Sequence, residues 1–224
     1  MSIVVNSHVP SLPSGFIEKI SQVEPPTFGH FLEEGFCDPQ ISRRAGTGQF
    51  AGRAVTVRIT ATDSTLVHKA TGMLQPGDVL VVDTGGDVRH AAVGGLVAGA
   101  VAAAHAVGVV IDGVCTDLST LKETGLHVYA RGTSVLTTKL LGMDAGGINV
   151  PVQCGGVTVA PGDVVIGDEN GVLISSPSAI ENVLAAARNS DESEPGLLER
   201  LQGGEKLSAL SAADSLLAKL DVTG

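Results

Sequence analysis

The sequence predicts an α/β protein with a central β-α-β core, a hairpin-rich second half and a C-terminal helix. Short runs of Val, Ile and Leu alternate with helical segments over residues 79–130, as in parallel strands joined by crossover helices. Residues 149–177 carry β-branched runs separated by Gly-Gly, Pro-Gly-Asp and Glu-Asn-Gly turns, which is typical of hairpins. Hydrophobic residues make up 43% of the 224-residue chain, which supplies enough apolar material for a core.

The first third of the chain is predicted to combine short helices with one strand. Residues 11–35 are expected to be helical because apolar side chains recur three or four positions apart. The Pro-Pro pair at 25–26 is expected to end the first helix, and a second short helix is expected over 27–34. Residues 54–60 alternate in polarity and predict a strand, and residues 64–73 predict another short helix.

The central core is predicted to alternate three strands with two helices. Gly108 is expected to end the longer helix, which should begin near the Gly-Gly pair at 94–95. The two Pro-Gly-Asp-Val stretches, at 76–79 and 161–164, indicate that one turn type is used twice. The strands are expected at 79–83, 109–112 and 126–130, and the helices at 93–107 and 119–124.

The C-terminal part is predicted to be helical in two pieces. A helix is expected over 178–188, with Ser178 as its N-cap. A polar break is expected at 189–195. An amphipathic helix, interrupted by the glycines at 203–204, is expected over 197–217.

The length of 224 residues allows one large domain or two small ones, and we expect a single domain over residues 1–190 and a helical tail over 191–224. The tail has little to bury alone, so we expect it to pack on a neighbouring subunit. A net charge of −10 repels phosphates and argues against direct nucleic-acid binding. The sequence shows neither a leader peptide nor a membrane segment, and its three scattered cysteines fit a reducing compartment. We therefore expect a cytoplasmic protein.

Two features at strand-to-helix transitions predict a site for an anion and a metal ion. Gly94, Gly95 and Leu96 open a helix, and the free amides and dipole of a helix start favour a carboxylate or phosphate. Alternatively, the glycines only allow close packing. Asp117 follows the strand at 109–112 and could hold Mg²⁺ or Mn²⁺ by one oxygen. Alternatively, it is the N-cap of the next helix.

A third group of polar residues follows the strand at 79–83. Asp83, Asp87, Arg89 and His90 could face the same crevice, although Asp87 and His90 could equally be solvated loop residues. Motifs for a serine nucleophile, a nucleotide-binding loop, a dinucleotide fold and a zinc protease are all missing. Three lysines could in principle form a Schiff base, but their surroundings single out none of them: Lys69, Lys122 and Lys139.

Several motifs then occur in an order that resembles a known family. GDVLVVD, GGL, GVVIDGVCTD and LHVYARGTS, followed by the stretch at 149–177, are similar to the core of the class II pyruvate aldolases. These are the metal-dependent 4-hydroxy-4-methyl-2-oxoglutarate aldolases, and their family includes the regulator of ribonuclease E activity A. The similarity covers roughly residues 45–190. It implies a swivelling-type β/β/α domain that assembles as a homotrimer or a dimer of trimers (a homohexamer).

The resemblance also implies a site between subunits. Asp117 would hold Mg²⁺ or Mn²⁺, largely through water, and the amides of Gly94, Gly95 and Leu96 would receive the pyruvate portion of a 2-oxo acid. The enzyme would be a lyase, either an aldolase or an oxaloacetate decarboxylase, that stabilises a pyruvate enolate without a Schiff base. A Glu from a neighbouring subunit would contribute. Glu194 is the better match, and Glu199 is the second choice.

One residue departs from the family pattern. The aldolases carry Arg before the metal-binding Asp, and this chain has Thr116, which offers no charge to a carboxylate or enolate. Arg89 or Arg131 could compensate if either reaches the site. Two hypotheses therefore remain: a lyase in which Thr116 has a retuned catalytic and substrate-binding role, or a non-catalytic interaction protein similar to the ribonuclease regulator.

Overall fold

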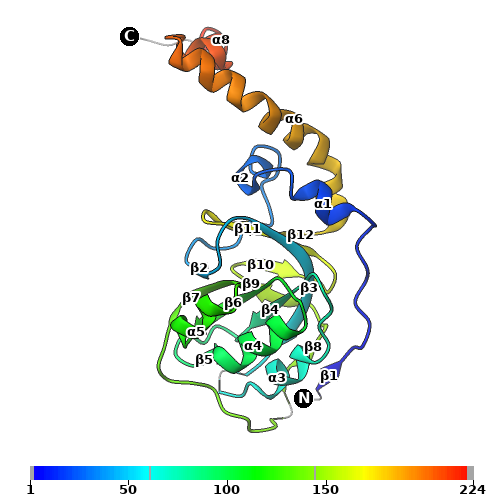
Figure 1. Cartoon of the computed structure of the whole chain (residues 1–224). Coiled ribbons are helices and arrows are strands. Elements are labelled where there is room, and N and C mark those ends of the chain that lie inside the picture. The colour runs from blue at the N-terminus through cyan, green and yellow to red at the C-terminus, as the bar shows by residue number, and fades with distance from the viewer. Residues whose placement is uncertain (1–2, 61, 144, 221–224) are drawn as a thin grey trace.

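The computed structural model describes residues 3–60, 62–143 and 145–220 and has the predicted α/β architecture with a C-terminal helix (Figure 1). The helices are α1 (Phe16–Ile20), α2 (Pro25–Phe28), α3 (Thr65–Thr71), α4 (Gly95–Ala103), α5 (Leu118–Glu123), α6 (Pro177–Gln202), α7 (Leu207–Leu210) and α8 (Ala213–Leu217). The strands are β1 (Val4–Val5), β2 (Ser42–Ala45), β3 (Phe50–Arg58), β4 (Asp78–Asp83), β5 (Ala91–Val93), β6 (Gly108–Cys115), β7 (His127–Thr133), β8 (Gly147–Ile148), β9 (Val152–Cys154), β10 (Val157–Val159), β11 (Val164–Asp168) and β12 (Gly171–Ser175).

A parallel run of strands, in the order β3-β4-β6-β7, forms the centre of the larger sheet. The chain passes from β4 to β6 through β5 and α4, and from β6 to β7 through α5. This confirms the predicted alternation of strands and crossover helices. Strands β8 and β11 pair antiparallel with β3, and β2 pairs antiparallel with β7, so the sheet is mixed.

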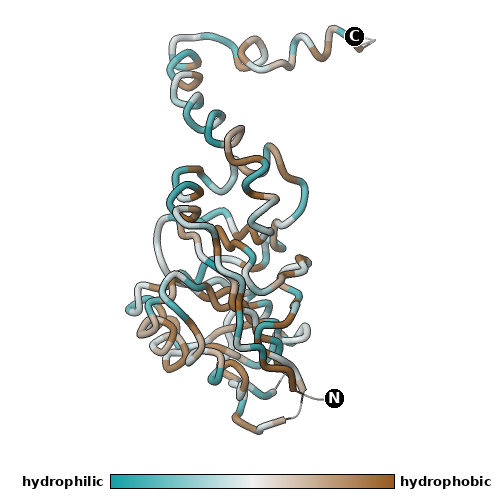
Figure 2. The backbone as a smooth tube through the Cα atoms, turned by 90° about the vertical axis from the view of Figure 1, so that its right-hand side faces the viewer, coloured by the Kyte–Doolittle hydropathy of each residue, from teal (hydrophilic) through white to brown (hydrophobic). Residues whose placement is uncertain are grey.

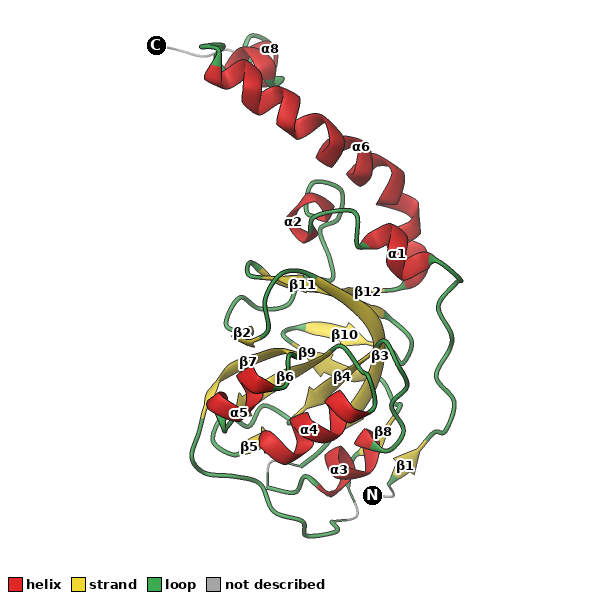
Figure 3. Cartoon of the chain, viewed as in Figure 1, coloured by secondary structure: helices red, strands yellow, loops and turns green. Residues whose placement is uncertain are grey.

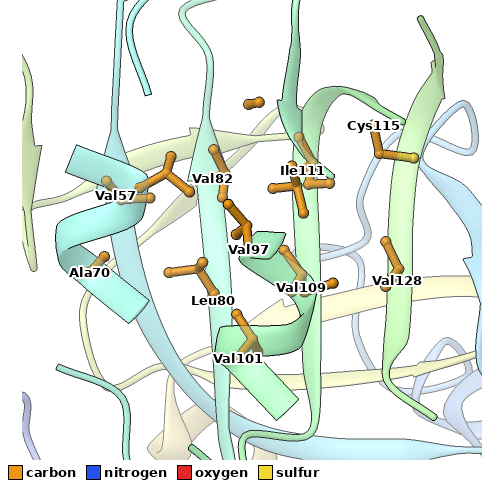
Figure 4. Packing of buried hydrophobic residues seen from close by; sticks show 14 of the residues in the cluster. Val57, Ala70, Leu80, Val82, Val97, Val101, Val109, Ile111, Cys115 and Val128 are labelled. Carbon is orange, nitrogen blue, oxygen red and sulfur yellow. The ribbon is translucent and has the colours of Figure 1, made fainter. Parts of the chain in front are cut away.

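Strand β4 has a continuous run of apolar residues because both of its faces are buried in the core. Leu80 and Val82 point to the face covered by α3 and α4, while Val79 and Val81 point to the face covered by β9 and β12. All four are fully buried. Figure 4 shows the first face, where Leu80 and Val82 pack among valines from α4 and the neighbouring strands. A strand buried on both faces needs apolar residues at every position.

Two local predictions for the core were wrong. Val93, predicted as the first residue of the helix at 93–107, ends strand β5 instead, because Ala91 and Val93 pair with the end of β6. Gly108 does not end α4 but begins β6, where a Cβ would lie 2.9 Å from the carbonyl oxygen of His127. The left-handed residue after α4 is His105, with φ of 56°.

The second half contains the predicted hairpins. β9 pairs antiparallel with β10 across the Gly-Gly turn, and β11 pairs antiparallel with β12. The two Pro-Gly-Asp turns share one geometry. Asp78 and Asp163 each accept a hydrogen bond from the amide three residues earlier, at 2.7 and 2.8 Å. Gly77 and Gly162 adopt φ of 84° and 91°, as the turn requires.

Helices α1, α2 and α6 form a third layer over β11 and β12, with Phe16, Phe28 and Leu184 buried between them. The Pro-Pro pair does not end the first helix, since α1 already ends at Ile20. Pro25 begins α2 instead, a position that proline favours because its missing amide needs no partner there. The C-terminal prediction was wrong in detail. Ser176, not Ser178, caps α6, and the helix runs unbroken through the polar stretch at 189–195. Figure 3 shows α6 extending away from the sheet, with α8 near its far end.

The tail beyond the domain body is mostly exposed. Figure 2 shows hydrophilic and hydrophobic stretches alternating along it, and among residues 190–220 only a few side chains are even half-buried. Within the described part of the chain, no helix is both long enough and apolar enough to cross a bilayer. Packing of this tail on a neighbouring subunit stays a prediction.

Candidate functional site

The candidate site lies where two neighbouring parallel strands lead into helices. β5 leads into α4 and β6 leads into α5, and the ends of the two strands are paired, with Val93 opposite Cys115. The amide of Thr116 donates to the carbonyl oxygen of Val93 at 3.0 Å, which fastens the two exits together. Ligands in open α/β sheets bind at this end of the strands. The pairing brings Gly94–Leu96 beside Asp117.

The side chain of Asp117 faces the start of α4. Its Oδ2 accepts a hydrogen bond from the amide of Gly95 at 2.9 Å. Its Oδ1 has only a long contact, 3.4 Å, with Oγ1 of Thr116. Asp117 occupies the N-cap position of α5, but its side chain makes no capping bond there. The carboxylate therefore binds the neighbouring helix through Oδ2, while Oδ1 makes no short hydrogen bond and Asp117 lines the pocket described below.

The backbone of Asp117 is in the left-handed region, with φ of 57° and ψ of 43°. Few residues other than glycine adopt this conformation, and it costs on the order of 1 kcal/mol. Asp tolerates the conformation better than most residues, and such residues cluster at functional sites. An unfavourable backbone that holds a carboxylate beside helix amides is therefore a functional signal.

The glycines at the start of α4 make room for this carboxylate. A Cβ at Gly94 would lie 2.7 Å from Oδ2 of Asp117 and 2.9 Å from Cγ2 of Thr116. A Cβ at Gly95 would lie 2.9 Å from Cγ2 of Thr120. All three distances are shorter than side-chain carbons normally allow. The alternative explanation, that the glycines only allow close packing, is thus correct in part. The groups that pack closely against these glycines include Thr116 and Asp117 of the candidate site.

These residues line a pocket of about 300 Å³. One wall consists of Gly94–Val97 with Thr116 and Asp117. A second wall comes from Ser64 and His68 of the α3 region, and a third from the loop Thr137–Leu140. Leu96 stands at the rim with 88% of its surface exposed. The structure therefore brings together Gly94, Gly95, Leu96, Thr116 and Asp117.

Sequence reasoning did not identify His68 or Lys139 as site residues. Both are exposed side chains on the pocket. The only available signal for Lys139 was its inclusion among three lysines that could carry chemistry. Its position depends on contacts between segments about 75 residues apart, such as the bond from Ser64 to the Lys139 carbonyl, which no local pattern reveals.

Four charged residues considered for the crevice lie outside this pocket. Asp83 is buried and accepts from the amides of Gly85 and Gln153. Asp87 binds the amides of Arg89 and His90 and the His90 ring, and these contacts lower the pKa of its carboxyl even though burial alone would raise it. The side chain of Arg89 is exposed and does not line the pocket.

Arg131 also lies outside the pocket and forms ion pairs with two other residues. Its guanidinium forms ion pairs with Asp38, at 2.7 Å, and with Asp112, at 2.5 Å. These side-chain hydrogen bonds outweigh burial and raise the pKa of Arg131. Arg131 therefore does not replace the missing arginine at position 116.

Glu194 and Glu199 lie on the exposed part of α6. Figure 1 shows this part of α6 at the opposite end of the molecule from α4 and α5. Neither residue lines the pocket of its own chain. A contribution from either one requires a second subunit.

The pocket fits a divalent ion only if water supplies most of the ligands. Within residues 3–60, 62–143 and 145–220, no three His, Cys, Asp or Glu side chains gather as a metal-binding group. Asp117 offers one carboxylate oxygen, Oδ1, that makes no short hydrogen bond. Mg²⁺ is commonly held by one or two carboxylates together with water and substrate oxygens. This donor set fits a weakly held, water-rich ion such as Mg²⁺ or Mn²⁺.

The fold and the pocket define a class: a mixed α/β domain whose candidate site joins two strand-to-helix transitions. Residues 27–174 match the RraA-like family, described as Aldolase/RraA. The chain belongs to this family.

Individual relatives agree with this assignment. A Halalkalibacterium halodurans protein named "Putative 4-hydroxy-4-methyl-2-oxoglutarate aldolase" is 38% identical over 140 residues, which cover 62% of this chain and 66% of that protein. The structure of the RNA-processing inhibitor RraA from Thermus thermophilis is 30% identical, covers 69% of this chain and 92% of its own, and has a TM-score of 0.61. A Pseudomonas syringae protein of unknown function, 19% identical, covers 93% of this chain and 98% of its own with a TM-score of 0.75, which shows that the fold extends to most of the chain.

Proposed function

We propose that this protein is a lyase that requires Mg²⁺ or Mn²⁺ and cleaves a C–C bond of a 2-oxo dicarboxylate. Substrates such as 4-hydroxy-4-methyl-2-oxoglutarate or oxaloacetate would release pyruvate. The observation that carries the proposal is the geometry of Asp117. One carboxylate oxygen binds a helix-start amide at 2.9 Å, the other makes no short hydrogen bond, and the residue lines the pocket, so a cation and an organic anion can share one hollow. Relatives named as aldolases support the same reaction class.

The chain's own residues have distinct roles in this proposal. Asp117 binds the ion through Oδ1 and is held in place by Gly95. The first-turn amides of a helix have no acceptor within it, so the Leu96 amide can donate to a substrate oxygen. Leu96 and Val97 add apolar surface to the pocket. The metal supplies positive charge where the enolate oxygen develops.

The reaction balances without a covalent intermediate. In the aldol cleavage, the bond between C3 and C4 breaks, the 4-hydroxyl loses its proton and the electron pair moves to the pyruvate enolate. The enolate then takes up a proton at C3. In oxaloacetate, loss of carbon dioxide leaves the same enolate, so one site supports both reactions. Glu194 of a neighbouring subunit is the proposed partner for proton transfer in a homotrimer or a dimer of trimers.

Pyruvate release coupled to lactate dehydrogenase tests this function. We expect turnover of both substrates with Mg²⁺ or Mn²⁺, and loss of turnover on chelation that either metal restores. Asp117→Asn keeps the size and the left-handed preference of the residue but removes the charge. We expect it to lower kcat/KM by about a hundredfold or more without changing the melting temperature by more than a few degrees. Metal-independent turnover, or an active Asp117→Asn variant, would exclude this mechanism.

Thr116 supports a second candidate, a non-catalytic protein that binds a partner. It cannot supply the charge that an arginine would place at this position. The acidic surface would then bind a basic partner, and that binding should weaken as salt concentration rises. Thr116→Arg separates the possibilities. A large gain in lyase rate indicates a decayed enzyme, and loss of an existing rate indicates a retuned one. No lyase activity in either form, together with recovery of a salt-sensitive partner, supports the binding role.

A further inference from the structure

The candidate pocket contains a cation that the proposed mechanism does not use. The ammonium group of Lys139 donates to the carbonyl oxygen of Thr137 at 3.0 Å and to its Oγ1 at 3.3 Å. Among the residues that the structure describes, no carboxylate lies within ion-pairing distance of it, although the chain carries a net charge of −10. Thr137 and Lys139 both line the pocket, so the unpaired charge lies on its wall.

Backbone bonds fix the loop that carries Lys139 on both sides. The amide of Lys139 donates to the carbonyl of Thr62 at 2.8 Å, and its carbonyl accepts from the amide of Ser64 at 2.9 Å. On the other side, Thr138 donates its amide to the carbonyl of Ala91 at 3.1 Å. Ala91 begins the strand that leads into Gly94. The loop is thereby joined to the same strand that positions the helix-start amides.

A buried carboxylate holds the rest of this loop. Asp63, only 5% exposed, accepts hydrogen bonds from the amides of Leu141 and Met143, at 3.1 and 2.7 Å. It also accepts from the amide and hydroxyl of Thr65 at the start of α3. Four donors converge on one carboxylate, so Asp63 ties α3 to the loop. Lys139 is therefore presented to the pocket on a constrained segment rather than on a free one.

The second wall supplies an imidazole side chain. His68 of α3 is exposed and lines the same pocket. The wall with Asp117 is thus acidic, and the walls with Lys139 and His68 are basic. A ligand with a metal-binding 2-oxo acid at one end and a carboxylate at the other matches this distribution of charge.

We propose that Lys139 binds the second carboxylate of a 2-oxo dicarboxylate, the one outside the pyruvate portion, and that Asp63 is the positioning residue that holds it there. This assignment rests on the proposed function for the orientation of the ligand. Lys139 makes the pocket selective for dicarboxylates over 2-oxo acids with an apolar end. It also supplies a positive charge to the pocket that residue 116 does not.

A matched pair of ligands tests the assignment without requiring turnover. 2-Oxoglutarate and 2-oxopentanoate have the same chain length and differ only in a terminal carboxylate or methyl group. Isothermal titration calorimetry with Mg²⁺ should show tighter binding of 2-oxoglutarate to the unmodified protein. Lys139→Met should weaken 2-oxoglutarate about tenfold and leave 2-oxopentanoate unchanged. Lys139→Arg should keep most of the preference, because the charge remains.

Lys122→Met is the matched control, since Lys122 is an exposed lysine of α5 that does not line this pocket. It should bind both ligands as the unmodified protein does. Equal loss of both ligands in Lys139→Met, or no loss of either, overturns the assignment. Failure of the proposed function shows separately, as the absence of pyruvate release by the unmodified protein from both 4-hydroxy-4-methyl-2-oxoglutarate and oxaloacetate.

The role of Asp63 is tested by a double-mutant cycle. Asp63→Asn should weaken 2-oxoglutarate more than 2-oxopentanoate, because the loop no longer holds Lys139 in place. Combined with Lys139→Met, it should add little to the loss of 2-oxoglutarate, since both changes remove the same contact. A merely structural role predicts additive losses that are equal for the two ligands. That result would remove Asp63 from the proposal and leave Lys139 to its own test.

Discussion

From the sequence, Asp117 could be either a metal ligand or the N-cap of α5. Its position before α5 matches an N-cap, but its carboxylate binds the first amide of α4 instead. The left-handed backbone at 57° aims the side chain across to the neighbouring helix. The residue type was predictable, because a carboxylate after a buried strand is a common ligand. The direction of the side chain was not, because it depends on a backbone conformation rare outside glycine.

Adding a single carbon atom at Gly94 tests whether the position of the Asp117 carboxylate matters. We expect Gly94→Ala to displace the Asp117 carboxylate, since the added Cβ would lie 2.7 Å from Oδ2. Metal-dependent turnover should fall at least tenfold while the protein still folds, because the clash lies at an exposed site. Steady-state kinetics with thermal melting measures both effects.

Gly99→Ala provides the control for Gly94→Ala. It lies on α4 with open space around it. Its added methyl should leave turnover unchanged and slightly favour the helix. Full activity in Gly94→Ala would mean that the carboxylate has room to move without losing its role.

At the scale of elements, α6 shows why a polar stretch does not have to break a helix. Asp191 lies in the middle of the predicted break, and its carboxylate accepts from the amide of Glu24 at 2.8 Å and from the hydroxyl of Thr27. These contacts use its charge at the start of α2, where acidic groups are favoured. Pro195 continues the helix although it has no amide to donate. Sequence patterns could not show that another helix needed these polar groups.

The hydrogen bonds that Asp63 accepts from Leu141 and Met143 give a prediction about acid stability. Burial alone would raise the pKa of Asp63, but the hydrogen bonds from Thr65, Met143 and Leu141 outweigh it and lower the pKa to about 2. Because the folded-state pKa is depressed, this stabilisation is complete above the unfolded value of 3.8. It is lost as pH falls toward 2, and amounts to about 2 kcal/mol.

Urea denaturation of the unmodified protein and of Asp63→Asn measures the stabilisation that the ionised Asp63 carboxylate contributes. We expect the gap in unfolding free energy between the two to be constant near neutral pH and to narrow as pH falls from 4 to 2. Thr65→Val removes one hydrogen-bond donor to Asp63. In this background, the difference in unfolding free energy between Asp63 and Asp63→Asn should therefore be smaller. A gap that does not change with pH would show that Asp63 keeps its ordinary pKa.

At the scale of the whole molecule, the exposed tail and the position of Glu194 far from the pocket lead to one prediction. Leu197, Leu198 and Leu207 are 39%, 50% and 64% exposed, which leaves apolar surface without a partner in the single chain. Glu194 cannot line its own pocket. We therefore predict assembly with a neighbouring subunit, as the resemblance implies, which would cover the exposed leucines and could bring Glu194 to another chain's pocket.

Mixing two inactive variants tests assembly directly. We expect Asp117→Asn and Glu194→Gln each to lack lyase activity as homo-oligomers. Co-expressed subunits should regain a fraction of it, because some sites then pair an intact Asp117 with an intact Glu194 from the neighbour. Light scattering establishes the number of subunits. An inactive mixture of confirmed hetero-oligomers would show that each site lies within one chain or does not use Glu194.

The α/β class, the parallel core, the hairpins and the family motifs could all be predicted from the amino-acid sequence. These follow from periodicity, turn residues and apolar runs, which are properties of neighbouring residues. The same local signals identified Gly94–Leu96 and Asp117 as candidates. Predicted ends of helices were less accurate, as Gly108 and Ser178 show, because a glycine or serine that suits a cap also suits a strand or a first turn.

Only the tertiary structure decided which candidates share a site. The pairing of β5 with β6 places residues 22 apart within one hydrogen bond, and the Asp63 network brings Lys139 to the same pocket. The structure also shows that Arg131 forms ion pairs with Asp38 and Asp112, away from the site. Side chains from distant segments meet because strand register and buried hydrogen bonds fix the backbone in three dimensions, and no stretch of sequence contains that information alone.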